Sequence, residues 1–490
     1  MRLFSPFTIN GMTLANRIVL PAMVTRLSGE DGRINADVRD RYLRFAKGEP
    51  GLIVVEAMSV HGGRSGPLLR MSDDSFIDEH ARMARDVHAS SPSKIAAQII
   101  HFLKISRSGW RQTIAELSKN EIAEVITGYA AAAGRVRRAG YDAVELHMAH
   151  AYTLSSFLSL RNRRQDEYGR SLENRMRPMT QVILAVRAEV GADFPVGVRF
   201  DGEECIKDGY TLSDAREMAL RMAKLGVDWI SISAGGKFED AIHKPGEPLY
   251  PYTGYSGDRC MPSVNYPDGA NIYLADGIKA HLNSQGHATP VVATGKIRTP
   301  ELAESLLAGG RADLIGMARA LLADPDWPRK ARDGRSETIV RCVYGNVCKA
   351  LDENFRKVRC VLWPKGALQA PDIDDAEPPR WLYDDPNLKA QEVTGRVQLK
   401  WNHASDDVAI YGYEIYRSAD GGAFDHLGSV KGVFYVDDDV VGGVRYRYWV
   451  RAYDPAGNRT PRSNVAEVML PDPTPGRGPR AGAAMDGPRA

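Results

Sequence analysis

The feature that most constrains this chain is a series of eight short apolar runs that alternate with longer helical segments. The runs are apolar on both faces, which is typical of parallel strands that are buried on both sides. They lie at residues 17–23, 52–56, 94–100, 143–147, 196–200, 229–233, 291–294 and 314–317. Eight strands alternating with helices predict an α/β fold, a closed (β/α)8 TIM barrel, with an open doubly wound sheet as the structural alternative.

The segments between the runs carry helix start and stop signals. Ser118 with Glu121 forms the pattern of a capping box. Thr299 followed by Pro300 places an N-cap residue before a proline at the first helical position, and Gly309 is typical of a helix end. These signals support helices between the strands.

The sequence changes character after the last of the eight runs. We predict that residues 1–365 form the barrel and a cysteine-containing extension. Residues 366–392 are rich in proline and aspartate and predict an extended linker. Residues 473–490 are rich in proline, glycine, alanine and arginine, which predicts a disordered tail.

Between the linker and the tail, over residues 393–472, the apolar period becomes two. Val397, Leu399 and Trp401 alternate with polar residues, and a second alternating segment begins at Tyr446. This pattern predicts a small all-β, immunoglobulin-like sandwich. The order of its aromatic residues resembles a fibronectin type III domain, and nothing in it indicates catalysis.

Charge and composition exclude several classes of function. The 490 residues include 64 basic and 62 acidic side chains, a formal charge of +2, so the chain has no general attraction for nucleic acid or for anionic membranes. No run approaches the roughly 20 apolar residues of a membrane helix. Five cysteines are too few for a disulfide framework. We expect a cytoplasmic protein with a small-molecule substrate, and an oligomer is compatible with the sequence.

Two neighbouring motifs carry the most specific functional signal. The first is His147-Met-Ala-His150-Ala-Tyr152, and the second, at residues 166–175, is Asp-Glu-Tyr-Gly-Arg-Ser-Leu-Glu-Asn-Arg. Together they resemble the old yellow enzyme family of flavin mononucleotide (FMN) flavoproteins, including its dienoyl-CoA reductase and trimethylamine dehydrogenase branches. The resemblance covers residues 1 to about 365. It implies FMN as cofactor, NAD(P)H as electron donor and a substrate with an activated alkene.

The first motif also suits this chemistry on physical grounds. Hydride addition to an enone builds negative charge on the carbonyl oxygen, and the N–H groups of His147 and His150 are suited to bind that oxygen. The adjacent carbon then needs a proton, which the phenol of Tyr152 can supply because its reference pKa is about 10. A metal-binding pair or two structural core histidines are the alternatives.

Several further residues match flavin contacts by resemblance. Arg199 matches an arginine beside the pyrimidine edge of the flavin, and Gln98 matches a glutamine that hydrogen-bonds that ring. The residues that match the segments lying along the flavin ring are Pro21, Ala22, Met23 and Ala57.

The cofactor's phosphate is expected on the last two βα-loops of the barrel, where phosphate sites are frequent. These loops contain Gly295 and Lys296, and then Ala318 and Arg319; backbone N–H groups and an arginine suit a dianion. Val24 departs from the family, because relatives place threonine or cysteine there. Valine cannot hydrogen-bond the flavin.

Three cysteines near the end of the barrel region allow two interpretations. The iron–sulfur branches carry three closely spaced cysteines and a fourth further on, whereas this chain has Cys342, Gly345, Cys348 and Cys360. A 4Fe-4S cluster normally takes four thiolates, and glycine offers no ligand. The alternatives are a cluster with an altered ligand and a degenerate site with reduced thiols.

The favoured function is an NAD(P)H-dependent ene-reductase with FMN. The second is an iron–sulfur flavoprotein fed by a separate electron-donor protein. A third, of another class, is a binding or scaffold protein with a retired flavin site. Iron content separates the first two, and a colourless protein indicates the third.

Overall fold

The computed structural model describes residues 1–63, 66–104, 112–235, 257–264, 266–364, 366–371, 388–393, 395–402, 412–453, 459–460 and 462–471. The chain divides into two compact units, Met1–Pro378 and Pro379–Ala490. The predicted tail at 473–490 and most of the predicted linker at 366–392 lie outside the described residues.

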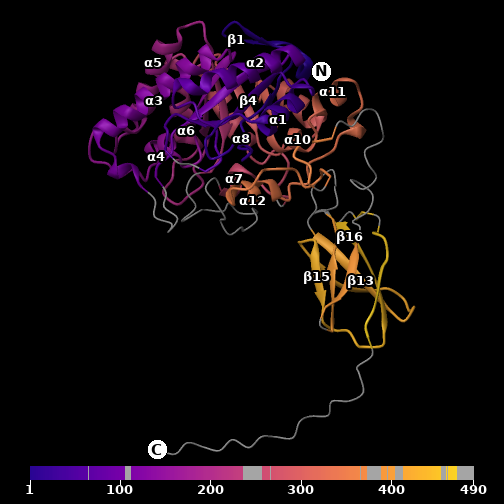
Figure 1. The fold of residues 1–490 in the computed structure, drawn as a ribbon. Coiled ribbons are helices and arrows are strands. Elements are labelled where there is room, and N and C mark those ends of the chain that lie inside the picture. The colour runs from indigo at the N-terminus through magenta and orange to yellow at the C-terminus, as the bar shows by residue number, and fades with distance from the viewer. Residues whose placement is uncertain are drawn as a thin grey trace, which may run out of the picture. The chain divides into compact units, whose positions relative to one another are not determined.

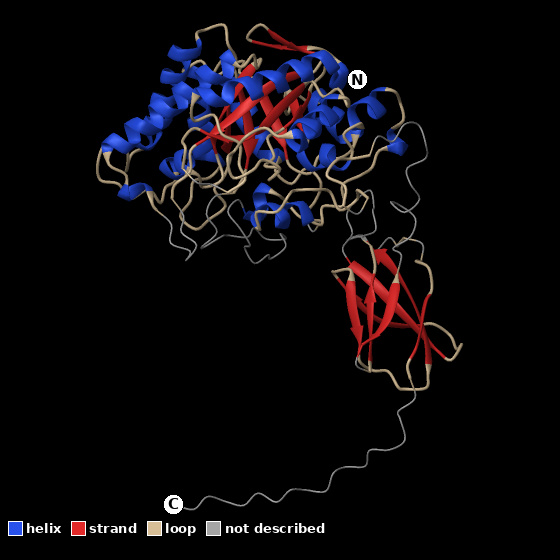
Figure 2. Ribbon diagram, in the orientation of Figure 1, coloured by secondary structure: helices blue, strands red, loops and turns tan. Residues whose placement is uncertain are grey.

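The first unit is built around a closed barrel of eight parallel strands, in agreement with the sequence prediction (Figures 1 and 2). The barrel strands, in chain order, are β3 (Ile18–Leu20), β4 (Leu52–Ser59), β5 (Lys94–Ile100), β6 (Ala143–Met148), β7 (Val196–Asp201), β8 (Trp229–Ser233), β9 (Val291–Thr294) and β10 (Leu314–Gly316). Neighbours in the chain are neighbours in the barrel, and β10 closes it against β3. β3 is shorter than the apolar run at 17–23, since Pro21 has no N–H to continue the ladder.

Helices surround the strands in Figure 2, as a βα barrel requires. The α-helices are α1 (Ala36–Ala46), α2 (Ile77–Ser90), α3 (Lys119–Arg138), α4 (Thr153–Leu158), α5 (Leu172–Val190), α6 (Leu212–Lys224), α7 (Gly257–Cys260), α8 (Ile272–Ser284), α9 (Pro300–Ala308), α10 (Ala318–Ala323), α11 (Trp327–Arg332) and α12 (Val347–Glu353). The predicted caps are confirmed. Ser118 and Glu121 cap α3 reciprocally, and the Thr299 side chain accepts the N–H of Leu302 at the start of α9.

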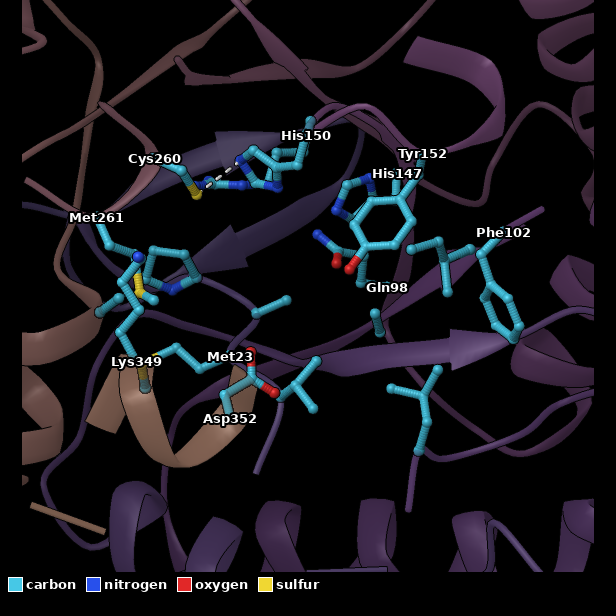
Figure 3. A pocket seen from close by; sticks show the side chains of 18 of the residues that line it. Met23, Gln98, Phe102, His147, His150, Tyr152, Cys260, Met261, Lys349 and Asp352 are labelled. Carbon is cyan, nitrogen blue, oxygen red and sulfur yellow. Dashed lines mark hydrogen bonds between the residues drawn. The ribbon is translucent and has the colours of Figure 1, made fainter. Parts of the chain in front are cut away.

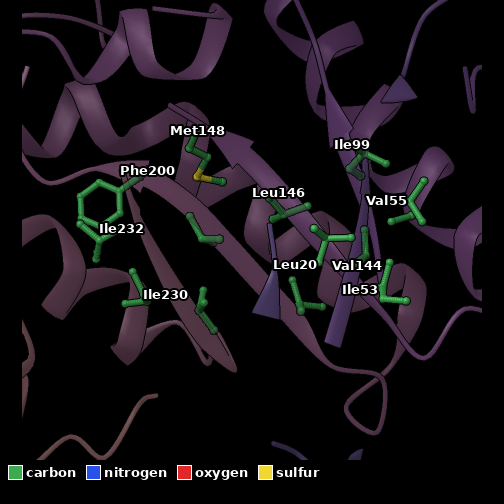
Figure 4. Packing of buried hydrophobic residues seen from close by; sticks show 14 of the residues in the cluster. Leu20, Ile53, Val55, Ile99, Val144, Leu146, Met148, Phe200, Ile230 and Ile232 are labelled. Atoms are coloured by element: carbon green, nitrogen blue, oxygen red, sulfur yellow. The ribbon is translucent and has the colours of Figure 1, made fainter. Parts of the chain in front are cut away.

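Alternate residues of each strand face the helices and the barrel interior. The outward set, which includes Val144, Leu146 and Met148 of β6, packs against the helices (Figure 4). The inward set is apolar at the start of the strands, where Trp229 is fully buried. Gly197 opposite it cannot be replaced, because a β-carbon there would lie 1.9 Å from the indole.

A short hairpin covers the amino-terminal end of the barrel. Its strands β1 (Phe7–Ile9) and β2 (Met12–Leu14) pair antiparallel. Ile9, Met12 and Leu14 belong to the same buried cluster as Trp229. This end is therefore apolar and closed, which leaves polar inward residues to the carboxyl-terminal end.

The second unit consists of two small antiparallel sheets, ordered β11-β12-β15 and β14-β13-β16-β17. Its strands are β11 (Lys389–Val393), β12 (Arg396–Lys400), β13 (Gly412–Ala419), β14 (Asp425–Val430), β15 (Phe434–Asp437), β16 (Arg445–Tyr453) and β17 (Ala466–Met469). The predicted alternation holds in β16, where Tyr446, Tyr448 and Val450 are buried. The rings of Trp401 and Tyr413, one from each sheet region, lie 5.5 Å apart.

Among the helices that the structure describes, none combines the length and the apolar character needed to span a bilayer.

Candidate active site

One cavity of about 1500 Å³ lies where the barrel strands end and their loops begin (Figure 3). Every residue proposed from sequence for catalysis or cofactor binding lines it: Pro21, Ala22, Met23, Ala57, Gln98, His147, His150, Tyr152, Arg199, Gly295, Lys296, Ala318 and Arg319. Pockets for one small ligand usually measure about 300–1,000 Å³. This cavity therefore has room for a cofactor together with a substrate.

His147 faces inward from β6 and is 4% exposed. Its Nδ1 accepts the backbone N–H of Ala149 at 3.2 Å. That bond assigns the imidazole proton to Nε2, which makes Nε2–H the donor that His147 can offer. Burial, assisted by the positive charge of Arg199, lowers the pKa of His147 to about 3, so the ring is neutral at physiological pH.

His150 is held differently. Its Nε2 lies 2.6 Å from the Ser233 hydroxyl and 3.1 Å from the Cys260 thiol, a contact drawn in Figure 3. Ser233 Oγ accepts a hydrogen bond from Arg199 at 3.3 Å, and its own hydrogen can be donated to His150 Nε2. When the Ser233 hydroxyl donates in this way, the His150 proton is on Nδ1, the opposite tautomer from His147. Burial lowers the pKa of His150 well below its usual value, with His147 and Arg199 adding to the shift.

Tyr152 stands at the start of α4, as its N-cap residue. Its ring centroid is 5.2 Å from that of His147, and the His147 and His150 centroids are 5.1 Å apart. The three rings of the motif are therefore brought together at one wall of the cavity. They come together because the chain turns sharply between them, with His150 and Ala151 both at positive φ.

Arg199 and Gln98 lie on neighbouring parts of the barrel interior. The Arg199 guanidinium donates to Ser231 at 2.9 Å and to Ser233. Gln98 Nε2 donates to Glu145 Oε1 at 2.7 Å, which fixes the orientation of its amide. Burial raises the pKa of Glu145, although Arg199 opposes the shift.

The loops after β9 and β10 form the opposite end of the cavity. Backbones approach closely here, because a β-carbon on Gly316 would lie 2.3 Å from Thr294 and 3.2 Å from Pro21. The Lys296 ammonium is directed to backbone carbonyls, including those of Ser263 at 3.3 Å and Tyr266. Burial lowers its pKa to about 8.

Arg319 is engaged in a similar way. It donates to the Pro262 carbonyl at 2.8 Å and to Asn346 Oδ1 at 2.5 Å. Both Arg319 and Lys296 also lie over the ring of Tyr344, each at 4.7 Å from its centroid. The two cations thus tie the segments that contain Pro262 and Tyr344 to the cavity, and a phosphate here would depend on the backbone N–H groups of the two loops.

The residues present fit an FMN molecule. An amide and a guanidinium, Gln98 and Arg199, would face the polar edge of a flavin ring, and small residues such as Ala22 and Ala57 leave room along its plane. The glycine-lined loops at the other end suit a phosphate. Val24 also lines the cavity, so the departure from the family falls at the site itself.

The cysteines supply three of the four thiolates that a 4Fe-4S cluster normally takes. Within the described part of the chain, no group of three His, Cys, Asp or Glu side chains is arranged to hold a metal ion, although Cys342 and Cys348 lie near enough to Cys360 to raise its thiol pKa. Cys348 lines the cavity, Cys342 and Cys360 are buried, and Gly345 supplies no ligand. Burial raises the pKa of all three thiols, to about 11 for Cys342.

The sequence analysis missed several residues at the cavity. His61 packs against His101 and Phe102, and the turn of α12 contributes Asp352, which pairs with Arg26 at 2.7 Å. Cys260, which no sequence motif singles out, also lines the cavity. These residues come from loops and from a helix beyond the barrel, where no periodic pattern indicates which way a side chain points.

The hydrogen-bond donors and the phenol at this cavity are suited to oxidoreductase chemistry, and the comparisons with known proteins assign that class. The chain belongs to the NADH:flavin oxidoreductase / NADH oxidase family, which it matches over residues 2–107, 104–250 and 266–338. The family implies a flavin and NAD(P)H.

Individual relatives agree with this assignment. The chain is 34% identical to an NADH oxidase of Thermoanaerobacter brockii over 389 residues, 74% of this chain and 56% of that protein. It is 35% identical to an NADPH dehydrogenase of Geobacillus sp. (strain WCH70), over 69% of this chain and 95% of that protein. The fold is similar to that of a 2-naphthoyl-CoA reductase in complex with 2-naphthoyl-CoA, with a TM-score of 0.65, 23% identity, and coverage of 80% of this chain and 60% of that chain. The chain thus spans little more than half of the NADH oxidase.

Proposed function

We propose that the chain is an FMN-dependent ene-reductase that uses NAD(P)H to reduce a C=C bond conjugated to a carbonyl group. The observation that carries the proposal is the grouping of a neutral imidazole donor, a phenol and a guanidinium, His147, Tyr152 and Arg199, at one cavity. The similarity to an NADPH dehydrogenase over nearly that protein's full length supports NAD(P)H as the reductant.

The histidines bind the substrate carbonyl in this mechanism. His147 donates from Nε2 and His150 from Nδ1, and both donors stabilise the negative charge that grows on the carbonyl oxygen. When bound, FMN supplies the hydride, which it has taken from NAD(P)H, to the β-carbon. Tyr152 donates its hydroxyl proton to the α-carbon, and solvent then restores the phenol.

Arg199 and Gln98 prepare the cofactor side of the cavity. The guanidinium would place a positive charge beside the polar edge of a bound flavin, where it would favour the anionic reduced state electrostatically. Gln98, oriented by Glu145, would offer its amide oxygen to an N–H group of the flavin ring. Both side chains are buried and already hydrogen-bonded to the barrel, so they lose little freedom when the cofactor binds.

We assign no electron-transfer role to Cys342, Cys348 and Cys360, and we propose that they are reduced structural thiols. The second unit is a fibronectin type III-like domain in this proposal, and it contributes no group to the reaction. A cytoplasmic location and a small-molecule substrate remain part of the proposal.

The test is an absorption spectrum of the purified protein supplemented with FMN, followed by anaerobic reduction with NADH or NADPH and by reoxidation with a cyclic enone. We expect a yellow protein, bleaching by at least one nicotinamide, and a saturated ketone as product. Iron and acid-labile sulfide are measured in the same sample and are expected to be absent. A colourless protein with no affinity for FMN contradicts the proposal, and stoichiometric iron and sulfide favour the iron–sulfur alternative.

A further inference from the structure

Asp201, the last residue of β7, is a buried carboxyl that the mechanism above does not use. Its side chain is fully buried, and its Oδ2 accepts the backbone N–H of His150 at 2.8 Å. Oδ1 has no hydrogen-bond partner among the residues that the structure describes, and it lies 3.7 Å from His150 Nε2. One carboxyl group therefore accepts a hydrogen bond from the backbone of His150 and lies close to its imidazole.

The backbone contact matters because the chain is strained at this point. His150 and Ala151 have φ of 61° and 60°, a left-handed conformation that residues with a β-carbon rarely adopt. Asp201 holds the N–H of His150, and the Ser155 hydroxyl lies 3.3 Å from the N–H of Ala151. This turn sets the direction of both the His150 ring and the Tyr152 ring that follows it.

The strand register explains why Asp201 reaches His150. Asp201 pairs with Ser233 on β8, and Arg199, two residues earlier, lies opposite His147 on β6. Since alternate residues of a strand share a face, Asp201 points inward one layer above Arg199. It therefore meets the chain that leaves β6, where the motif begins.

We propose that Asp201 is a positioning residue of the two-histidine site, and that its protonated form keeps the His150 proton on Nδ1. The inference rests on the proposed function. A carboxylate so close to Nε2 would attract a proton to that nitrogen and so remove the donor from Nδ1, whereas a neutral carboxylic acid does not. Burial raises the pKa of Asp201 well above its usual value, in line with the neutral form.

Other charged or titratable groups also face Asp201 from the elements packed against it. Arg199 lowers its pKa and Glu204 raises it. In turn, Asp201 raises the pKa of Tyr210 on the following loop and of Cys260 on α7. A pH profile of this site therefore needs a variant that removes the Asp201 ionisation alone.

The experiment compares Asp201→Ala with Asp201→Asn in the FMN-loaded full chain. The alanine removes the acceptor of the His150 N–H, whereas the asparagine keeps an oxygen there and cannot ionise. We expect Asp201→Ala to slow enone reduction about 10–100-fold through misplacement of the site, with flavin reduction by NAD(P)H unchanged. Asp201→Asn keeps the oxygen acceptor, so its rate of enone reduction should lie within about fivefold of the wild-type rate, a factor that corresponds to about one hydrogen bond.

Asp324→Asn is the matched control, because Asp324 is also buried and also accepts a backbone N–H, that of Val340 at 2.8 Å, but does not line the cavity and does not contribute to the pKa shift of Asp201. It should leave enone reduction unchanged. If Asp201→Ala reduces the enone at the wild-type rate, the positioning role is overturned. An equal loss of flavin reduction and enone reduction in both Asp201 variants also overturns it, since that result indicates general damage.

A second readout separates this inference from the proposed function. The imidazole ¹⁵N signals of His150, assigned with a His150→Gln variant, should show the Nδ1–H tautomer in the wild type and should shift in Asp201→Ala. Unchanged His150 signals overturn the inference even if no alkene is ever reduced.

If the alanine variant does not fold, the pH dependence of Asp201→Asn tests the inference. The wild type should lose enone reduction as Asp201 ionises at high pH and Asp201→Asn should not, so an identical pH dependence in both overturns the inference.

Discussion

The phenol of Tyr152 stands edge-on to the imidazole of His147, with the ring centroids 5.2 Å apart and the ring planes at 84°. The contact is short enough for one substrate to touch both groups, an oxygen at the imidazole and an adjacent carbon at the phenol. It also restricts the rotation of Tyr152, which orients the hydroxyl before a substrate arrives.

Replacing Tyr152 with phenylalanine should therefore remove the proton donor of the reaction without disturbing the wall of the cavity. We expect enone reduction to slow by about 10²–10⁴, the usual contribution of general acid catalysis. Flavin reduction by NAD(P)H, measured by stopped-flow absorbance, should be unchanged because no proton from Tyr152 enters that step. Unchanged turnover of a cyclic enone would remove Tyr152 from the donor role.

His147→Ala should remove one of the two donors to the carbonyl oxygen. Loss of an oxyanion donor costs about 10²–10³ in turnover, and we expect a loss of that size. Because burial lowers the pKa of His147 to about 3, this residue should produce no inflection in the rate of the wild type between about pH 5 and about pH 8. His88→Ala, which removes a partly exposed imidazole outside the cavity, is the control and should leave turnover unchanged.

The barrel and most of the candidate site could be predicted from sequence because both depend on local patterns. The apolar runs mark the strands, and the polar residues that follow them, such as His147 and Arg199, must lie at one end of a parallel barrel. Inward polar residues within the strands were harder to predict. Glu145 and Asp201 lie in or beside runs that are otherwise apolar, and only the closed barrel shows which face they share.

The remaining wall of the cavity depends on long-range packing. Asp352 lies more than 300 residues after Arg26 in the chain, yet the two form an ion pair, and no spacing rule relates them. For the cysteines, by contrast, the spacing along the chain is visible in the sequence, whereas their arrangement in space is not. Their spacing resembles that of a cluster, but Gly345 stands at the fourth ligand position, and no group of three side chains arranged to hold a metal ion occurs among the described residues.

Cys260 should react slowly with thiol reagents despite lining the cavity. Burial raises its pKa to about 11, so only a small fraction is thiolate at neutral pH. We expect the rate of labelling by iodoacetamide, followed by mass spectrometry of the Cys260 peptide, to rise about tenfold per pH unit from about pH 7 to about pH 10. In the denatured chain the rate should level off near the ordinary thiol pKa of about 8.5. If the labelling rate of the folded protein levels off at that same pH, burial does not control the pKa of Cys260.

The final prediction concerns Glu56, whose carboxyl anchors the segment that follows β3. Its Oε2 accepts the backbone N–H of Thr25 at 2.7 Å, and its Oε1 accepts the Thr25 hydroxyl at 2.6 Å. Burial raises its pKa from 4.5 to about 7, against the effect of the Thr25 hydrogen bonds. A raised pKa in the folded state means that the stabilising contribution of Glu56 is complete below about pH 4.5 and is lost as the pH rises through about 7.

Glu56→Gln cannot ionise, so it should lack this pH dependence. The free energy of unfolding of the variant, minus that of the wild type, should therefore increase by about 2–3 kcal/mol between about pH 4.5 and about pH 8, as measured by urea denaturation. Thr25→Val tests the cause: it removes a hydrogen bond that lowers the pKa of Glu56, and it should move the loss of stability to higher pH. A free-energy difference that stays constant across this range would mean that Glu56 titrates alike in the folded and unfolded chains, and the anchoring of Thr25 would then not depend on the protonation of Glu56.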